Sequence, residues 1–460
     1  MERRFLSGGM DKKLKCDMQN SKKRFFGNIG WLLGGKIVNM ILQFVVSLAT
    51  ARYLGPSNFG TINYVAAFVS FFSSIASLGL SIIVIKEIAN GQSNDNEIIW
   101  TSIWLRLGTA ILSTISIIAL MFVTNRNDPL IVQIAFLESL SIIFSSFDTI
   151  NYYFQAKLLS KWSSIAGVLA YLGMSLYRIY LLMTKAEIVW FALATSMDMI
   201  FLTFFLLIFF IRIEGFHPKF NWSLGKTLLK QSYHYLIAGL ISILYAQVDK
   251  VMLGNMVDSA AVGYYSAALT ISTLWSMIPT ALIQSLSPIL YEAADQDRTL
   301  FLRRLRQSYA ALFWLNALYS IFVCIFAHWV MLLLYGEDYL AGIGALRIVV
   351  WYYGISTMST LNQVYLANDG KNKYINRFCL AGLVTDVILN SIMIPLWGIS
   401  GAAFATLITH IVIQVVMPYM YKDTREIAVS IIQGALLRDV INKEEISLIK
   451  AGIKNLLKKD

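Results

Sequence analysis

The sequence is poor in the residues that build disulfide frameworks, metal centres and enzyme active sites. It has only three cysteines, four histidines and seven prolines among 460 residues. Cys16, Cys324 and Cys379 are odd in number and form no CxxC pair, which excludes a disulfide framework and a zinc site. The histidines are scattered, and neither H-E-x-x-H nor G-x-S-x-G occurs. We therefore expect no enzymatic activity and no metal cofactor.

Charged residues are scarce as well. They make up 14% of the chain, whereas hydrophobic residues make up 57%, a balance that excludes an ordinary soluble domain. A helix that spans a bilayer needs about 20 predominantly apolar residues. The chain contains twelve such segments, at residues 26–50, 60–87, 98–123, 129–154, 162–183, 187–212, 227–253, 260–290, 307–335, 342–367, 374–395 and 398–421.

Basic residues are almost absent from every second gap between these segments. Only Arg52, Arg126, Lys185 and Lys250 lie in those gaps or at the adjoining segment ends, whereas 30 of the 38 Lys and Arg residues lie in the two tails, in the other gaps or at the segment ends beside them. The positive-inside rule therefore predicts that both termini are cytoplasmic. Topology also accounts for the net charge of +11, and no basic stretch interleaved with aromatics predicts nucleic-acid binding.

The order of the segments predicts an all-α polytopic membrane protein of about 12 transmembrane helices in two six-helix lobes. Because six spans return each lobe to the same side, the lobes form a parallel pseudo-two-fold repeat. Leu54-Gly55 before Gly60 and Leu253-Gly254 before Gly263 support this repeat. The expected regions are a basic cytoplasmic tail at 1–25, an N-lobe at 26–212, a cytoplasmic linker at 213–226, a C-lobe at 227–421 and a cytoplasmic amphipathic tail at 422–460.

The amphipathic tail carries isoleucines and leucines at helical spacing, interspersed with lysines. A helix lying on the cytoplasmic leaflet fits this pattern best, and a partner-docking helix is the alternative.

One nucleotide-binding pattern is a false match. Gly30 to Lys36 fits G-x-x-x-x-G-K, but Ile37 follows where a metal-binding hydroxyl is needed, and the motif lies inside a spanning segment. The sequence therefore predicts no nucleotide site of its own.

Seven charged residues lie at membrane depth. Each costs about 2.5–3.5 kcal/mol near the bilayer centre, so seven facing lipid would cost on the order of 20 kcal/mol. A fold stable by roughly 5–15 kcal/mol cannot absorb that. Most must face the protein interior, form pairs or line water: they are Lys36, Arg106, Glu138, Arg178, Asp198, Arg347 and Asp386.

Two interpretations of these charges remain open. One is structural pairing, for example of Lys36 with Glu138 or Asp198. The other is a polar cavity along the pseudo-axis, in which cations attract an anionic substrate and carboxylates carry protons or Na⁺. The candidate substrate-binding residues are Lys36, Arg52, Arg178 and Arg347, and the candidate ion-coupling residues are Glu138, Asp198 and Asp386.

Several motifs resemble one family. Residues 51–64, Ala-Arg-Tyr-Leu-Gly-Pro followed by Phe59-Gly60-Thr-Ile-Asn-Tyr64, look like the N-terminal signature of polysaccharide-repeat-unit flippases, the Wzx-type O-antigen and capsule transporters. Ser77-Leu-Gly-Leu80 with Lys86-Glu-Ile-Ala89 is similar to their second helix, and Asp249-Lys-Val-Met-Leu-Gly254 to their Asp-Lys-x-x-Leu-Gly helix end. The resemblance covers residues 25 to about 420.

That family belongs to the multidrug/oligosaccharidyl-lipid/polysaccharide exporter superfamily. The resemblance implies two lobes around a central cavity that work by alternating access in the bacterial inner membrane. The implied substrate is an undecaprenyl-diphosphate-linked oligosaccharide moved from the cytoplasmic to the periplasmic leaflet. The implied partners are this lipid-linked oligosaccharide, membrane lipids, and the polymerase and chain-length proteins of the same pathway.

Two other functions fit the sequence less well. A cation-coupled multidrug or metabolite exporter of the same superfamily would favour acidic and aromatic cavity residues, against which the four intramembrane cations argue. A membrane-embedded polymerase or ligase would need a long external loop, and all external gaps here are short.

Overall fold

The computed structural model describes residues 3–91, 94–126 and 128–438, and within these ranges the chain is helical, with no strand. Contacts divide the chain into two compact units, one of residues 1–54 and 65–243 and one of residues 55–64 and 244–460. This division falls inside a helix rather than in the expected linker at 213–226. The lobe limits 26–212 and 227–421 remain a proposal.

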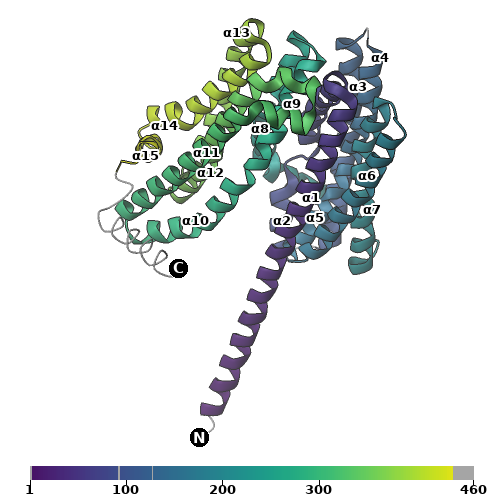
Figure 1. Ribbon diagram of the computed structural model, residues 1–460. Coiled ribbons are helices and arrows are strands. Elements are labelled where there is room, and N and C mark those ends of the chain that lie inside the picture. Colours follow the sequence, from purple (N-terminus) through teal and green to yellow (C-terminus); the bar gives the residue numbers. More distant parts are fainter. Residues whose placement is uncertain (1–2, 92–93, 127, 439–460) are drawn as a thin grey trace, which may run out of the picture. The chain divides into compact units, whose positions relative to one another are not determined.

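The first unit is built from long helices around an apolar core of Leu80, Ile103, Phe154 and Phe210 among others. Figure 1 shows α3, α4, α6 and α7 in one bundle. The helices are α1 (Arg3–Ala76), α2 (Leu80–Asn90), α3 (Asp95–Thr124), α4 (Pro129–Ser145), a 3₁₀ turn (Ser146–Asp148), α5 (Thr149–Ala156), α6 (Ser160–Met183), α7 (Ile188–Glu214) and the first part of α8 (Trp222–Met256).

The second unit has its own core, which includes Phe301, Tyr309, Tyr365 and Ile427. In this unit α11 packs against α10, α12 and α15. After α8, the elements of this unit are α9 (Ser259–Trp275), α10 (Met277–Gln296), α11 (Arg298–Tyr335), a 3₁₀ segment (Glu337–Gly342), α12 (Ile343–Asn368), α13 (Lys373–Ile411), a π-helical turn (Val412–Val416), α14 (Met417–Met420) and α15 (Arg425–Ala435).

Ten helical segments in the described part of the chain are long and apolar enough to cross a membrane. Two of them, Val38–Asn90 and Lys373–Met420, contain 53 and 48 residues. At 1.5 Å per residue these would be about 80 and 70 Å long, more than twice the hydrocarbon core. Each is interrupted by a non-helical glycine with positive φ, Gly55 at +71° and Gly398 at +55°. When each of these two long segments is counted as two spans, the ten segments give the twelve spans that the sequence predicts.

The interruption at Gly398 reverses the chain. Asp386 and Thr409 are 23 residues apart, which in a straight helix would separate them by about 35 Å. Instead the Thr409 hydroxyl donates a hydrogen bond of 3.1 Å to Asp386 Oδ1. The two limbs of α13 therefore pack side by side. Together with the long apolar helices, this confirms the all-α polytopic fold class expected from the sequence.

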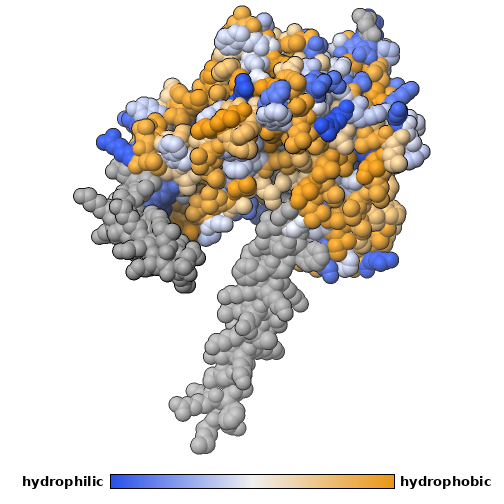
Figure 2. All heavy atoms as spheres, in the orientation of Figure 1, coloured by the Kyte–Doolittle hydropathy of each residue, from blue (hydrophilic) through white to orange (hydrophobic). Residues whose placement is uncertain are grey.

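The surface is that of a membrane protein. Figure 2 shows hydrophobic residues over much of the visible face of both units. Leu112, Leu176 and Leu333 are 65, 68 and 76% exposed, a degree of exposure on long apolar helices that suits lipid rather than water.

Gly60 and Gly263 lie near the starts of two spanning segments, 60–87 and 260–290, and both allow close backbone contact. A Cβ on Gly60 would lie 1.7 Å from the Ser259 carbonyl oxygen, and one on Gly263 would lie 2.0 Å from the Pro56 carbonyl oxygen. The Tyr64 hydroxyl donates to Asn255 Oδ1 at 3.0 Å beside this crossing. The two glycines that support the sequence repeat thus face each other's backbones within the second unit.

Gly79, which joins α1 to α2, combines a left-handed backbone with a close helix contact. Its φ is +64°, and a Cβ there would lie 2.5 Å from the Leu236 amide nitrogen of α8. Gly91 has the same backbone conformation, φ +65°, with nothing within 4 Å of the corresponding Cβ. Substitutions at Gly79 and Gly91 therefore separate the free-energy cost of a left-handed side-chain-bearing residue from the cost of steric overlap with α8.

We expect Gly79→Ala to lower the unfolding free energy by clearly more than Gly91→Ala. The left-handed conformation alone costs an alanine roughly 1–2 kcal/mol, which both variants share. Overpacking against the α8 backbone adds about 1–3 kcal/mol only at position 79. Thermal unfolding of the two purified variants in detergent measures the difference, and equal melting temperatures would show that α8 yields without cost.

Charged residues outside the spans join α15 to the start of α11 and the end of α12. Arg298 bonds Asp369 at 2.8 Å and also contacts Glu426. Burial acts to raise the pKa of Asp369, but hydrogen bonds from Arg298 and Lys371 outweigh it and hold the pKa below its ordinary value of 3.8. The stabilisation is therefore present above the ordinary carboxylate pKa and is lost as the pH falls through the lowered one.

The helix α15 also buries its apolar face. Ile427 and Ile431 are part of the core of the second unit, and a Cβ on Gly434 would lie 2.9 Å from the Arg306 carbonyl oxygen of α11. Residues 425–435 therefore dock on protein, which differs from the expectation that the tail lies on the membrane surface. Residues 439–460 lie outside the described part of the chain, and their amphipathic helix stays a prediction.

Candidate functional site

A cluster of buried polar residues surrounds Asp249 in the second unit. Asn390 Nδ2 donates to Asp249 Oδ1 at 2.7 Å, while the Tyr265 and Thr406 hydroxyls donate to Oδ2 at 2.5 and 2.8 Å. The four residues come from α8, α9 and both limbs of α13. Asp249 is therefore a fully hydrogen-bonded carboxyl group inside an apolar helix bundle, and only 7% of it is exposed.

Asp386 is the second carboxyl group of this cluster. It is completely buried and interacts electrostatically with Asp249. Thr409 donates to its Oδ1, but its Oδ2 and the neighbouring Asn390 Oδ1 have no hydrogen-bond partner among the described residues. Two adjacent carboxyl groups at low dielectric cannot both be ionised unless a cation or a shared proton compensates them.

The donor set limits what this cluster can hold. It offers carboxylate, amide and hydroxyl oxygens, which suit a hard cation or a proton. In the described part of the chain, no group of three or more His, Cys, Asp or Glu side chains is placed to hold a metal ion. With only two carboxyl groups, the cluster is suited to a monovalent cation or a proton.

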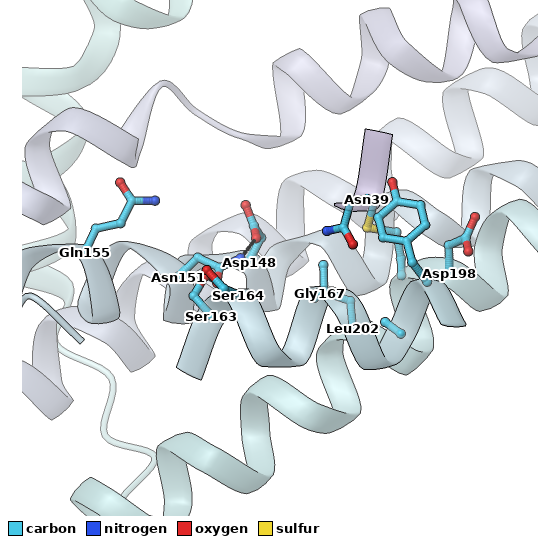
Figure 3. A pocket seen from close by; sticks show the side chains of 12 residues that line it. Asn39, Asp148, Asn151, Gln155, Ser163, Ser164, Gly167, Asp198 and Leu202 are labelled. Carbon is cyan, nitrogen blue, oxygen red and sulfur yellow. Dashed lines mark hydrogen bonds between the residues drawn. The ribbon is translucent and has the colours of Figure 1, made fainter. Parts of the chain in front are cut away.

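The first unit contains a pocket of about 250 Å³ between α1, the α4–α5 junction, α6 and α7, lined by both polar and apolar side chains. Figure 3 shows Gln155 and Asp198 at opposite ends of it, with Asn39 beside Gly167. Arg178 Nη2 bonds Asp198 Oδ2 at 2.5 Å, and both side chains are mostly buried. The observed intramembrane ion pair is thus Arg178–Asp198, which joins a candidate substrate-binding residue to a candidate coupling residue.

Glu138 and Arg106 are each enclosed in the first unit. Glu138 is fully buried on α4, and neither of its carboxyl oxygens has a hydrogen-bond partner among the described residues. Such a group is stable there only when it is protonated. Arg106 donates to the Thr149 hydroxyl at 2.9 Å and to the Ser145 carbonyl at 2.8 Å, so it ties α3 to the α4–α5 junction.

The other candidate cations are Arg52, Arg347 and Lys36. Arg52 is exposed on α1 three residues before Gly55, and Arg347 is exposed near the start of α12. Lys36 belongs to α1, but its side chain lies outside the part of the chain that the structure describes. Among the described candidate residues, Arg178 and Asp198 form an ion pair.

Asp249, Asn390 and Thr406 were absent from the candidates chosen by sequence. Asp249 stood in the Asp-Lys-x-x-Leu-Gly motif, close to the external end of its segment, and was not counted as a charge at membrane depth. Its meeting with Asp386 depends on the packing of α8 against both limbs of α13. The motif was the only signal in the sequence that marked this residue.

The arrangement of helices defines the class of protein. It is similar to that of lipid II flippase MurJ in an inward closed conformation, with a TM-score of 0.68 and 16% identity over 93% of this chain and 96% of that one. It is also similar to an inward-facing multidrug resistance MATE family transporter of the MOP superfamily, with a TM-score of 0.61 and 14% identity over 86% of this chain and 93% of that one. The chain therefore has the fold of this transporter superfamily.

Sequence comparison gives the family. Residues 25–294 match the family described as polysaccharide biosynthesis protein, and because this is more than half of the chain, the protein belongs to that family. It is 20% identical to the putative O-antigen transporter of Escherichia coli (strain K12), over 89% of this chain and 99% of the relative. It is 28% identical to probable flippase AglR of Haloferax volcanii over 36% of this chain, a match that spans only about a third of AglR.

Proposed function

We propose that this protein is a flippase that moves undecaprenyl-diphosphate-linked oligosaccharide repeat units, precursors of O antigen or capsule, from the cytoplasmic to the periplasmic leaflet. The observation that carries the proposal is family membership together with the near full-length match to a putative O-antigen transporter. The relatives are transporters, and the protein is accordingly a membrane transporter rather than an enzyme.

The chemistry of the substrate explains why cations are needed. A lipid-linked diphosphate carries about two negative charges that hydrocarbon rejects. Lys36, Arg52, Arg178 and Arg347 are the proposed phosphate contacts, since arginine offers paired donors and lysine a point charge. Arg178 would reach the substrate with donors other than the one that holds Asp198.

We place ion coupling chiefly at Asp386, together with Asp249. Of the three candidate carboxyl groups, Asp386 has a second carboxyl group beside it and an oxygen without a partner. Asp198 is held by Arg178, and the carboxyl oxygens of Glu138 have no hydrogen-bond partner among the described residues. Binding of a proton or Na⁺ would relieve repulsion between the two carboxylates, and this energy would differ between conformations of the transporter.

The proposed setting is the bacterial inner membrane with both termini cytoplasmic, where the transporter would act with the polymerase and chain-length proteins of the pathway. Deleting the gene should leave lipid-linked repeat units in the cytoplasmic leaflet and remove the surface polymer. Extraction and mass spectrometry of the accumulated lipid identify the substrate. Absence of any lipid-linked sugar, with export of a cationic drug instead, would favour the multidrug exporter.

We expect Arg178→Ala and Lys36→Ala to insert normally but to reduce surface polymer at least tenfold. Each ionic hydrogen bond to phosphate contributes roughly 1.5–3 kcal/mol, which corresponds to a tenfold or larger change in occupancy. Lys36→Arg should retain more activity than Lys36→Ala if charge is what matters. Asp198→Asn keeps Arg178 but neutralises its partner, so it shows whether loss of function follows the pair or the phosphate contact. Normal polymer in both alanine variants would show that these charges are structural.

A further inference from the structure

The pocket of the first unit is too large for a single dehydrated ion. Its volume of about 250 Å³ equals the share of about eight water molecules in liquid water. An ion that has lost its water is held by ligands at 2–2.6 Å and needs far less room. The pocket therefore suits a small molecule or part of a larger one.

The lining is rich in neutral hydrogen-bonding groups. Amides and hydroxyls come from three helices, α1, α5 and α6, and no Lys or Arg is among the described residues that line the pocket. The neutral polar residues are Asn39, Asn151, Gln155, Ser163, Ser164 and Tyr171. Such groups recognise a ligand that both donates and accepts hydrogen bonds.

The two carboxylates in the lining are already engaged, and they make an anionic ligand unfavourable. Asn151 Nδ2 donates to Asp148, and Asn151 Oδ1 accepts from Ser163, so this edge is ordered by contacts within the protein. Asp198 is held by Arg178. A phosphate group offers acceptors only, so it would find no donor in these carboxylates.

Two acceptor atoms in the lining lack donors. Asn39 Oδ1 and Asp198 Oδ1 are buried, and neither has a hydrogen-bond partner among the described residues. A buried acceptor left without a donor costs about 1–3 kcal/mol, so both atoms favour a ligand that carries hydroxyl donors. Together with the adjacent amides and hydroxyls, these atoms form a site that suits a ligand with hydrogen-bond donors facing Asn39 and Asp198 and with acceptors elsewhere.

We propose that this pocket binds a sugar residue of the transported molecule, next to Arg178, which bonds the lining residue Asp198 and is a proposed contact of the diphosphate. The inference rests on the proposed function and adds to it a saccharide subsite within the first unit. Each sugar hydroxyl both donates and accepts, as a serine hydroxyl does, which matches the unsatisfied acceptors and the mixed lining. The subsite would make transport depend on the identity of the sugar as well as on the lipid diphosphate.

Gly167 offers a way to alter the pocket without removing a polar group. It lies in the pocket wall on α6, and a Cβ there would meet Asn39 Nδ2 at 3.1 Å. An alanine would therefore displace the Asn39 amide and narrow the pocket. Gly173 on the same helix is a matched control, because its Cβ would meet only ring carbons of Phe201 at an ordinary 3.7 Å.

The test measures binding to the full-length protein in nanodiscs with three probes. They are the lipid-linked repeat unit extracted from the deletion strain, undecaprenyl diphosphate without sugar, and the free oligosaccharide released from the first by mild acid. We expect Gly167→Ala and Asn39→Ala to weaken binding of both sugar-containing probes about three- to tenfold, the effect of one lost hydrogen bond. Undecaprenyl diphosphate should bind equally to wild type and to both variants, and Gly173→Ala should match wild type for all probes.

The outcomes separate the subsite from the proposed function. If wild type binds the lipid-linked unit but Gly167→Ala and Asn39→Ala bind it equally well, the subsite is wrong and the flippase proposal stands. If the variants lose undecaprenyl diphosphate to the same extent, the pocket does not recognise sugar. If wild type binds the free oligosaccharide but neither lipid probe, the subsite stands and the flippase proposal fails. If wild type binds none of the three, both fail.

Discussion

Asp249→Asn and Asp386→Asn are each expected to lower turnover at least tenfold while the lipid-linked substrate still binds. Either change leaves one carboxyl group without the second negative charge that makes cation or proton binding favourable. The coupling ion would then no longer distinguish one conformation of the transporter from the other. Substrate flipping in proteoliposomes, measured with imposed proton and Na⁺ gradients, provides the test.

Glu138→Gln is the matched comparison, because it replaces by an amide a carboxyl group that is equally buried but has no hydrogen-bond partner among the described residues. We expect this variant to keep its response to the gradient. Loss of gradient dependence in Glu138→Gln, with normal coupling in both aspartate variants, would place coupling in the first unit instead. Full transport by all three variants across a range of pH and Na⁺ would exclude coupling through these carboxyl groups.

Gly60→Ala and Gly263→Ala are each expected to lower stability by about 2–3 kcal/mol or more, enough to deplete folded protein in the membrane. In both cases the added methyl group meets a backbone carbonyl, at 1.7 Å and 2.0 Å, which no change of rotamer can relieve. The helices would have to separate, and the nearby bond from Tyr64 to Asn255 would be lost.

Gly108→Ala on α3 is the control, since nothing lies within 4 Å of its Cβ position and the residue is helical. It should equal or slightly exceed wild type, because alanine is the better helix former by about 1 kcal/mol. Detergent extraction followed by thermal unfolding compares the variants. Stability of Gly60→Ala and Gly263→Ala equal to that of Gly108→Ala would contradict the close crossing.

The glycine pattern shows how much a local signal can carry. The Leu-Gly and Gly positions near residues 54–60 and 253–263 were visible in the sequence as an internal similarity. The similarity marks equivalent positions, but it contains no information on whether those positions touch. That Gly60 and Gly263 approach each other's backbone depends on how the helices cross, which is a property of packing.

The same distinction applies to the charged residues. Burial costs predicted that intramembrane charges must find partners, and the pair Arg178–Asp198 satisfies that requirement. The pairing suggested from the sequence, Lys36 with Glu138 or Asp198, involves a side chain outside the described part of the chain and stays a prediction. Depth along a helix can be counted in the sequence, while the direction of a side chain around it cannot.

The sequence by itself determined the class of fold, the approximate positions of the spans and the family. These depend on long apolar segments and on short motifs, both of which are local along the chain. Only the tertiary structure decided that α13 folds back at Gly398, that Asp249 meets Asp386, and that α15 docks on α11. Each of these brings together residues distant in sequence, and their proximity is set by side-chain packing between helices rather than by any local preference of the chain.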